Sequence, residues 1–169
     1  MHRLRTKIGR GDRGFTLVEL LIVVAIIGIL AAIAIPQFSV YRTRSYNATA
    51  MSDLRNVRTS EENLFADNGS YVPAALGTGN LLFIFNGATV ATFSVSKNVR
   101  MGIETLAAVP TSTVVATTYT ITSKSDAGDR IFCGEAEQSS VLYNASAIGV
   151  PLTALVAASN ANNCTGTAL

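Results

Sequence analysis

A long apolar run near the start of the chain constrains its fold most strongly. From Phe15 to Ile35 there are 21 residues, and all but Thr16 and Glu19 are apolar or small. A helix of about 20 such residues spans the roughly 30 Å hydrocarbon core of a bilayer. The run is longer than a signal-peptide core of roughly 7–15 residues, and no small-x-small cleavage site follows it. It therefore predicts a membrane-spanning helix.

The carboxylate of Glu19 lies one turn inside this run. An ionised carboxylate at the centre of a membrane helix costs roughly 2.5–3.5 kcal/mol on insertion scales, and such residues are by default functional candidates. We therefore interpret Glu19 as a functional residue whose natural partner is a cation buried nearby.

The residues around Glu19 resemble the N-terminal signal of type IV pilins. The sequence GFTLVE occupies residues 14–19, and the apolar run that follows ends at Pro36. The chain thus combines the cleavage glycine, the following phenylalanine, the glutamate four residues later and the proline of that family. The similarity is strong over about residues 14–72 and includes the short pilins of metal-reducing bacteria.

The resemblance implies that three residues serve maturation and assembly. A prepilin peptidase would cut between Gly14 and Phe15, and the new N-terminus at Phe15 would be N-methylated. Glu19 would then neutralise the N-terminal amine of a neighbouring subunit. The implied partners are this peptidase and N-methyltransferase, an assembly platform with its ATPase, and further copies of the same chain.

This processing divides the chain into three segments. We expect residues 1–14 to be a cleaved leader and residues 15–36 to be the transmembrane and filament-core half of a helix. Residues 37–169 would form an exported globular domain that includes the second half of the helix. The leader carries five basic side chains, which places it in the cytoplasm by the positive-inside rule, although Arg42 and Arg44 follow the span.

Composition argues against several classes of function. Loss of the leader removes five of the 13 basic and one of the 11 acidic side chains, which leaves a net charge of −2 and disfavours nucleic-acid binding. The only histidine, His2, lies in the leader, so the mature chain lacks the usual general base. Two cysteines alone cannot form a structural zinc site. We therefore expect no enzyme, no cofactor and no metal.

Two groups of residues have a structural interpretation. Cys133 and Cys164 both lie on the exported side, and an even pair in an oxidising compartment predicts one disulfide. Four carboxylates would suit a calcium site, but their spacing is not that of an EF-hand loop. We favour a polar turn with solvated carboxylates at Asp126, Asp129, Glu135 and Glu137.

The first helix is expected to continue beyond Pro36, which removes a backbone donor and should kink it. Its second half has one apolar face, interrupted by Glu61, and this face comprises Met51, Leu54, Val57, Leu64 and Phe65. The helix should stop at Asp67-Asn68-Gly69, where Gly69 can take the left-handed cap.

Residues 70–90 are rich in Gly, Asn and Ser and predict a connecting loop with one short buried piece. Residues 91–144 alternate and predict an antiparallel meander of about four strands: Thr92–Ser96, Val99–Leu106, Thr113–Ser123 and Arg130–Glu137. Residues 145–169 lack clear periodicity. The expected class is α+β, the pilin fold, with one long N-terminal helix packed on a C-terminal antiparallel sheet.

The sequence is therefore interpreted as a structural subunit of a type IV pilus, used for adhesion, twitching motility or related surface functions. It would wait in the inner membrane of a Gram-negative bacterium and then join a surface filament. One alternative is a pseudopilin of a type II secretion system. Another is an electron-transporting filament, suggested by Phe15, Phe38, Tyr41, Tyr46, Phe65 and Tyr71; packing against neighbouring helices is the simpler role for these aromatic residues.

Overall fold

The computed structural model describes residues 14–107, 113–156 and 164–168. The chain divides after Val40 into two compact units. Helix α1 (Leu17–Asn68) supplies the first unit, and its last 28 residues, from Tyr41 onward, belong to the second unit with the sheet. The expected α+β class is confirmed. Residues 1–13 of the predicted leader lie outside the described residues.

The end of α1 is as the sequence predicts. Gly69 has a φ of 69°, in the left-handed region, and its amide donates to the carbonyl of Phe65 at 2.8 Å. Glycine takes this conformation without the steric penalty of a Cβ atom, so it ends the helix at Asn68.

The sheet contains eight strands within the described residues, all paired antiparallel in the order β3-β2-β1-β4-β5-β6-β7-β8. The prediction of about four strands was wrong. The strands are β1 (Ala74–Gly77), β2 (Asn80–Phe85), β3 (Ala88–Ser94), β4 (Val99–Thr105), β5 (Tyr119–Ser125), β6 (Arg130–Glu135), β7 (Leu142–Ala145) and β8 (Thr167–Ala168).

The error lies mainly in residues 70–90, which were expected to be a loop but contain β1, β2 and the start of β3. These strands are separated by tight turns. Asn86 and Gly87 have φ values of 51° and 76°, which are the positive values that a two-residue hairpin turn needs. An Asn-Gly pair after an apolar run is a strong hairpin signal, and it was present in the sequence.

The central strands were predicted more closely. Strand β4 begins at Val99 as expected, and β6 begins at Arg130. The predicted turn at 126–129 is confirmed, because the amide of Gly128 donates to Ser125 at 2.9 Å and joins β5 to β6. Strand β5 begins at Tyr119, six residues after the predicted start at Thr113.

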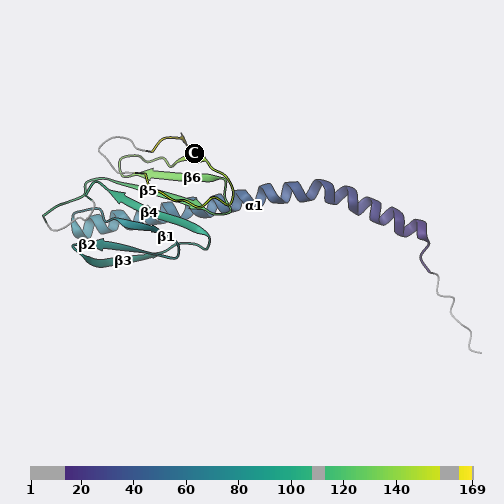
Figure 1. Ribbon diagram of the computed structural model, residues 1–169, viewed down its shortest axis with the longest axis horizontal. Helices are drawn as coiled ribbons and strands as arrows, with labels where there is room; N and C mark the ends of the chain where they lie inside the picture. The colour runs from purple at the N-terminus through teal and green to yellow at the C-terminus, as the bar shows by residue number, and fades with distance from the viewer. Residues whose placement is uncertain (1–13, 108–112, 157–163, 169) are drawn as a thin grey trace, which may run out of the picture. The chain divides into compact units, whose positions relative to one another are not determined.

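One face of the sheet packs on the part of α1 that belongs to the second unit (Figure 1). Ser123 Oγ donates to the carbonyl of Ala50 at 2.9 Å. A Cβ atom on Gly134 would lie 3.1 Å from Leu54 Cδ2, so this glycine allows the helix to approach β6 closely. The buried core between the layers includes Leu54, Val57, Leu64, Val72, Phe83, Met101, Ile103, Tyr119, Ile121 and Phe132.

Three buried polar residues of α1 fasten loops of the second unit to the helix. Asn47 exchanges two hydrogen bonds with Asp129, at 2.6 and 3.1 Å. Asp53 accepts the amide and the hydroxyl of Ser96, at 2.8 and 2.9 Å. Glu61 accepts the amide of Val72 at 3.0 Å. Glu61 thus does not merely interrupt the apolar face: its side chain is fully buried within it.

The other face of β5 is covered by residues 146–156, which we call the C-terminal segment. Every residue of β5 is buried, because α1 covers one face and this segment covers the other. Thr122 Oγ1 accepts the amide of Val156 at 3.2 Å. The ammonium of Lys124 donates to the carbonyls of Ala147 and Val150. Burial lowers the pKa of Lys124, and Asp126 and Asp129 oppose this effect.

The predicted disulfide between Cys133 and Cys164 is confirmed. It joins β6 to the end of the chain across a sequence separation of 31 residues. The amide of Cys164 also donates to the carboxylate of Glu135. The disulfide and this hydrogen bond therefore both attach Cys164 to β6.

Replacing both cysteines by serine is expected to lower the free energy of unfolding by about 3–4 kcal/mol, because the bridge limits the entropy of the unfolded chain. Denaturant titration of the full chain in a neutral detergent measures this change. The control is the wild-type chain after reduction and alkylation, which should lose a similar amount. An unchanged unfolding midpoint in the double variant would contradict a stabilising role for the bridge.

Candidate functional site

The N-terminal part of α1 presents an uncovered apolar surface. Every side chain from Leu17 to Leu30 is exposed, and individual aliphatic residues keep half or more of their surface accessible. Within the described residues, α1 is the one helix long and apolar enough to cross a membrane by length and composition. Such a surface needs either lipid or other apolar helices around it.

Glu19 caps the helix of its own chain. Its Oε2 atom accepts the amide of Thr16 at 2.9 Å and the hydroxyl of Thr16 at 2.8 Å. In return, Thr16 Oγ1 accepts the amide of Glu19 at 3.2 Å. This reciprocal arrangement is a capping box, in which Thr16 satisfies one free donor at the helix start and Glu19 satisfies another.

The capping role was missed in the sequence, although the Thr16-x-x-Glu19 spacing is its usual signal. The role also bears on how Glu19 tolerates an apolar position. A negative charge at a helix N-terminus interacts favourably with the helix dipole. Both bonds to Thr16 would remain after a cut between Gly14 and Phe15, so a processed chain would keep its helix start.

The predicted cleavage site lies just outside the helix. Gly14 and Phe15 are exposed, and neither belongs to a helix or strand. Phe15 keeps 89% of its surface accessible. A peptidase needs an accessible chain of this kind. Pro36 lies inside α1, and its carbonyl accepts the hydroxyl of Ser39 at 2.9 Å; the kink that it was expected to produce remains a prediction.

The four candidate calcium ligands do not form one cluster. Asp126 pairs with Arg100 at 3.3 Å, and Asp129 is held by Asn47. Glu135 binds the amide of Cys164 instead. Among the residues that the structure describes, no group of three or more His, Cys, Asp or Glu side chains is placed to hold a metal ion.

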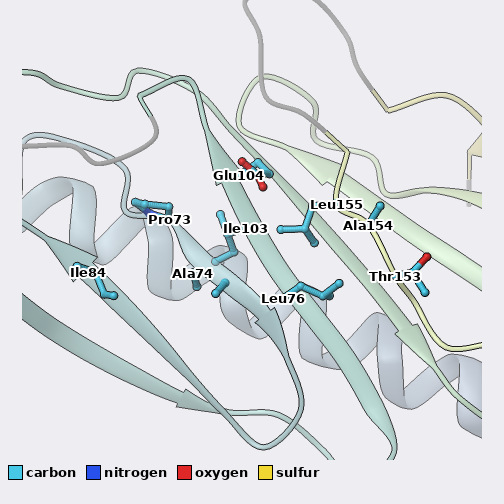
Figure 2. A pocket seen from close by; sticks show the side chains of 10 residues that line it. Pro73, Ala74, Leu76, Ile84, Ile103, Glu104, Thr153, Ala154 and Leu155 are labelled. Atoms are coloured by element: carbon cyan, nitrogen blue, oxygen red, sulfur yellow. The ribbon is translucent and has the colours of Figure 1, made fainter.

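A cleft of about 480 Å³ opens between β1, β4 and the C-terminal segment (Figure 2). Its lining is mainly apolar, with one carboxylate from Glu104 and one hydroxyl from Thr153. Leu155 reaches toward β1 and β4, and a Cβ atom on Gly102 would lie only 2.9 Å from its methyl groups. Gly102 therefore allows the C-terminal segment to lie close to the sheet. The cleft lies along the line where this segment packs on β1 and β4.

Two of the candidate aromatic residues belong to a packed group at the end of α1. The ring centroids of Phe65 and Tyr71 are 4.5 Å apart, and those of Tyr71 and Tyr119 are 4.6 Å apart. Glu62 accepts the hydroxyls of both tyrosines, at 3.3 and 3.1 Å. Burial raises the pKa of both phenols, and the Glu62 carboxylate adds to the effect. These contacts attach β5 and the chain after Gly69 to the helix.

The first comparison with known proteins concerns the same N-terminal segment. Residues 9–35 match the model of the prokaryotic N-terminal methylation motif. The chain therefore carries a prokaryotic N-terminal methylation motif. The motif covers the predicted cleavage site at Gly14, the exposed Phe15 and the capping Glu19, which are the features that the geometry places at the start of α1.

Curated relatives are similar to the chain over a longer stretch than this motif. The chain is 50% identical over 60 residues to the type IV major pilin protein PilA of Myxococcus xanthus, covering 36% of this chain and 27% of the relative. It is 48% identical over 78 residues to the type IV major fimbrial protein FimA of Dichelobacter nodosus, covering 45% and 50%. A fimbrial protein of Pseudomonas aeruginosa is 46% identical over 66 residues, covering 39% and 43%. The chain thus spans half or less of the length of these relatives.

Proposed function

We propose that the protein is a structural subunit of a type IV pilus. The observation that carries this proposal is the exposed apolar surface of Leu17–Leu30, which lies within the residues that match the methylation motif. That surface suits a membrane span before assembly and a bundle of identical helices afterwards. The relatives named above are pilins and fimbrial proteins, which supports the same conclusion.

In this proposal the assembly step is a pairing of charges. A prepilin peptidase frees the amine of Phe15, and the Glu19 carboxylate of a neighbouring copy pairs with it. Both groups are poorly solvated in an apolar surrounding. Their pairing offsets the desolvation cost of the amine and that of the carboxylate, and it fixes the axial offset between copies. Such a head-to-tail contact does not close on itself, and it propagates a helical polymer.

The remainder of the apolar segment permits close packing of the copies. Gly28 has no heavy atom within 4 Å of an added Cβ position. Small residues at a helix surface allow neighbouring helices to approach closely, and here they are Gly28, Ala31, Ala32 and Ala34. Extraction of this segment from a bilayer is uphill, so an assembly platform driven by an ATPase is required.

The proposed location is the inner membrane of a Gram-negative bacterium and then a surface filament that serves adhesion or twitching motility. A secretion pseudopilin would share the N-terminal segment, but the relatives named above do not favour it. The aromatic contacts described above pack β5 against the helix, which accounts for Phe65, Tyr71 and Tyr119 without a role in electron transport.

Replacing Gly14 by aspartate tests the proposal in cells. We expect the variant chain to keep its leader and surface filaments to disappear, because an uncut chain has no free amine at Phe15. Immunoblots of the membrane fraction and counts of filaments by electron microscopy measure the two effects. Gly77→Ala is the matched control, since it changes a glycine of β1, outside both the cleavage site and α1, where an added Cβ atom has room. Normal maturation and normal filaments in Gly14→Asp would contradict the assigned site.

A further inference from the structure

A second pocket lies in the unit formed by residues 41–169 and has a lining of a different kind. Its volume is about 350 Å³, and two of its six lining residues are arginines. The lining comes from α1 and β6 and comprises Arg44, Asn47, Ala48, Met51, Arg130 and Phe132. Nothing in the assembly proposed above makes use of this pocket.

Both arginines are held by tyrosine rings. The guanidinium carbon of Arg130 lies 4.2 Å from the ring centroid of Tyr143, and that of Arg44 lies 5.9 Å from the centroid of Tyr41. Within the described ranges, neither guanidinium has a carboxylate within 4.0 Å. A guanidinium that lies over a ring still presents its N–H donors at the edge of its plane, where they match the oxygens of phosphate.

The surroundings of the pocket favour an anion. The nearest acidic neighbour in sequence, Asp129, has its Oδ1 atom bound to Asn47 at 2.6 Å. The carboxylate of Asp129 therefore neutralises at most one of the two guanidinium charges of Arg44 and Arg130. Arg42, which donates to Tyr46 at 3.0 Å, adds a further positive charge on the same helix. Within the part of the chain that the structure describes, both guanidinium groups of this pocket lack a carboxylate partner, and they are therefore available to bind an oxyanion.

The position of Arg44 in the chain indicates where that oxyanion comes from. If Glu19 lies at one interface of the membrane, the next 20 residues, 20–39, rise about 30 Å and cross its hydrocarbon core. Arg44 then follows by five residues, or about 8 Å. With this placement, Phe38 and Tyr41, which are 71% and 64% exposed, would lie at the level where aromatic residues gather at a membrane surface.

We propose that the pocket between Arg44 and Arg130 binds the phosphate of an anionic lipid headgroup while the chain is anchored in the membrane. This inference rests on the membrane anchoring in the proposed function. It accounts for the two arginines, Arg42 and Arg44, that follow the span on the exported side. Headgroup binding would hold the globular unit against the bilayer until the helix is extracted.

Native mass spectrometry of the full chain tests this proposal. The protein is kept in a neutral detergent, with phosphatidylglycerol or phosphatidylcholine of the same acyl chains added. We expect the wild type to retain phosphatidylglycerol about tenfold better, and Arg44→Gln/Arg130→Gln to lose this preference, because each charged hydrogen bond is worth roughly a factor of ten. The matched control, Arg55→Gln/Lys97→Gln, removes the same charge at two exposed positions outside the pocket lining and should behave as the wild type.

Addition of millimolar inorganic phosphate separates the two sources of the oxyanion. Displacement of the lipid would mean that phosphate alone is recognised, and persistence of the lipid would mean that the glycerol headgroup contributes; both results support the site. Equal lipid retention by all three proteins would overturn the proposal. So would reduced filament yield in Arg44→Gln/Arg130→Gln with unchanged lipid retention, which would assign the pocket to a second copy. The lipid measurement uses unassembled chains, so it is independent of the pilus proposal.

Discussion

Replacing Glu61 by glutamine is expected to make the protein more stable at pH 9, by as much as about 5 kcal/mol. The side chain of Glu61 is fully buried, and its Oε1 atom has no hydrogen-bond partner within the described residues. Burial raises the pKa of this carboxyl to about 8, and the neighbouring Glu62 adds to the rise, while the amide of Val72 opposes it. The folded protein therefore holds a proton that the unfolded chain releases near pH 4.5.

The sign of the pH dependence follows from this proton. Between about pH 4.5 and 8 the folded state binds more protons than the unfolded state, so stability falls as the pH rises. The stability that the neutral Glu61 carboxyl contributes is fully present below pH 4.5. This contribution is lost once the pH rises above the folded-state pKa of about 8. Each pH unit costs about 1.4 kcal/mol. In the Glu61→Gln variant the new amide side chain would remain neutral throughout and would still offer an oxygen to the amide of Val72.

Denaturant titrations at pH 4.5, 7 and 9 measure the effect. At pH 4.5 the wild type and Glu61→Gln should differ by about 1 kcal/mol or less, since both side chains are neutral. Glu137→Gln is the matched control, because it makes the same chemical change at an exposed position. If the stability of wild type and Glu61→Gln changed in parallel with pH, the buried carboxyl would not be protonated in the folded state.

The second large effect concerns Glu19 and filament yield. Glu19→Ala should leave export and processing intact but reduce surface filaments by about tenfold or more, because the amine of Phe15 would remain buried without a partner. The structure allows a sharper variant. Glutamine can also occupy the last position of a capping box, so Glu19→Gln should keep the helix start and lose only the charge.

Three variants together separate capping from charge pairing. Glu19→Gln is expected to reduce filaments as strongly as Glu19→Ala. Thr16→Ala removes the capping hydroxyl, which accepts the amide of Glu19 at 3.2 Å, but keeps the carboxylate and should leave filament yield near normal. Immunoblots of sheared filaments, normalised to processed chain in the membrane, measure each yield. Wild-type yield in Glu19→Gln would limit Glu19 to a capping role.

Local signals in the sequence predicted the helix and its ends well. The apolar run and the glycine cap can both be recognised from residues close together in the sequence. The helix ends at Asn68, as the cap at Gly69 predicts. Helical periodicity also identified Leu54, Val57 and Leu64 as buried. Of the other two members of that face, Met51 is half-buried and Phe65 keeps 36% of its surface exposed.

The roles of the buried polar residues could not be read from periodicity. Asp53 and Glu61 are buried because distant backbone amides, at Ser96 and Val72, need acceptors. Which loop reaches which turn of the helix depends on the whole sheet. The position of the C-terminal segment could not be predicted for a related reason. Lys124 and Thr122 bind its backbone, and its own sequence has no periodic pattern.

Two other features were visible in the sequence and were missed. The Asn86-Gly87 pair marks the β2–β3 hairpin, and Thr16-x-x-Glu19 marks the capping box. Glu19 was predicted to act in assembly, and the structure shows that it also caps its own helix. One carboxylate can serve both purposes in turn, first at its own helix start and then, as we propose, beside the amine of another copy.

The most direct test of the pilus proposal is mass spectrometry of filaments sheared from the cell surface, combined with electron microscopy. The account predicts filaments that contain this chain beginning at N-methylated Phe15 and lighter by two hydrogens for the bridge between Cys133 and Cys164. A processed chain that stays in the cell envelope, with no surface filament containing it, would contradict the account and favour a secretion pseudopilin.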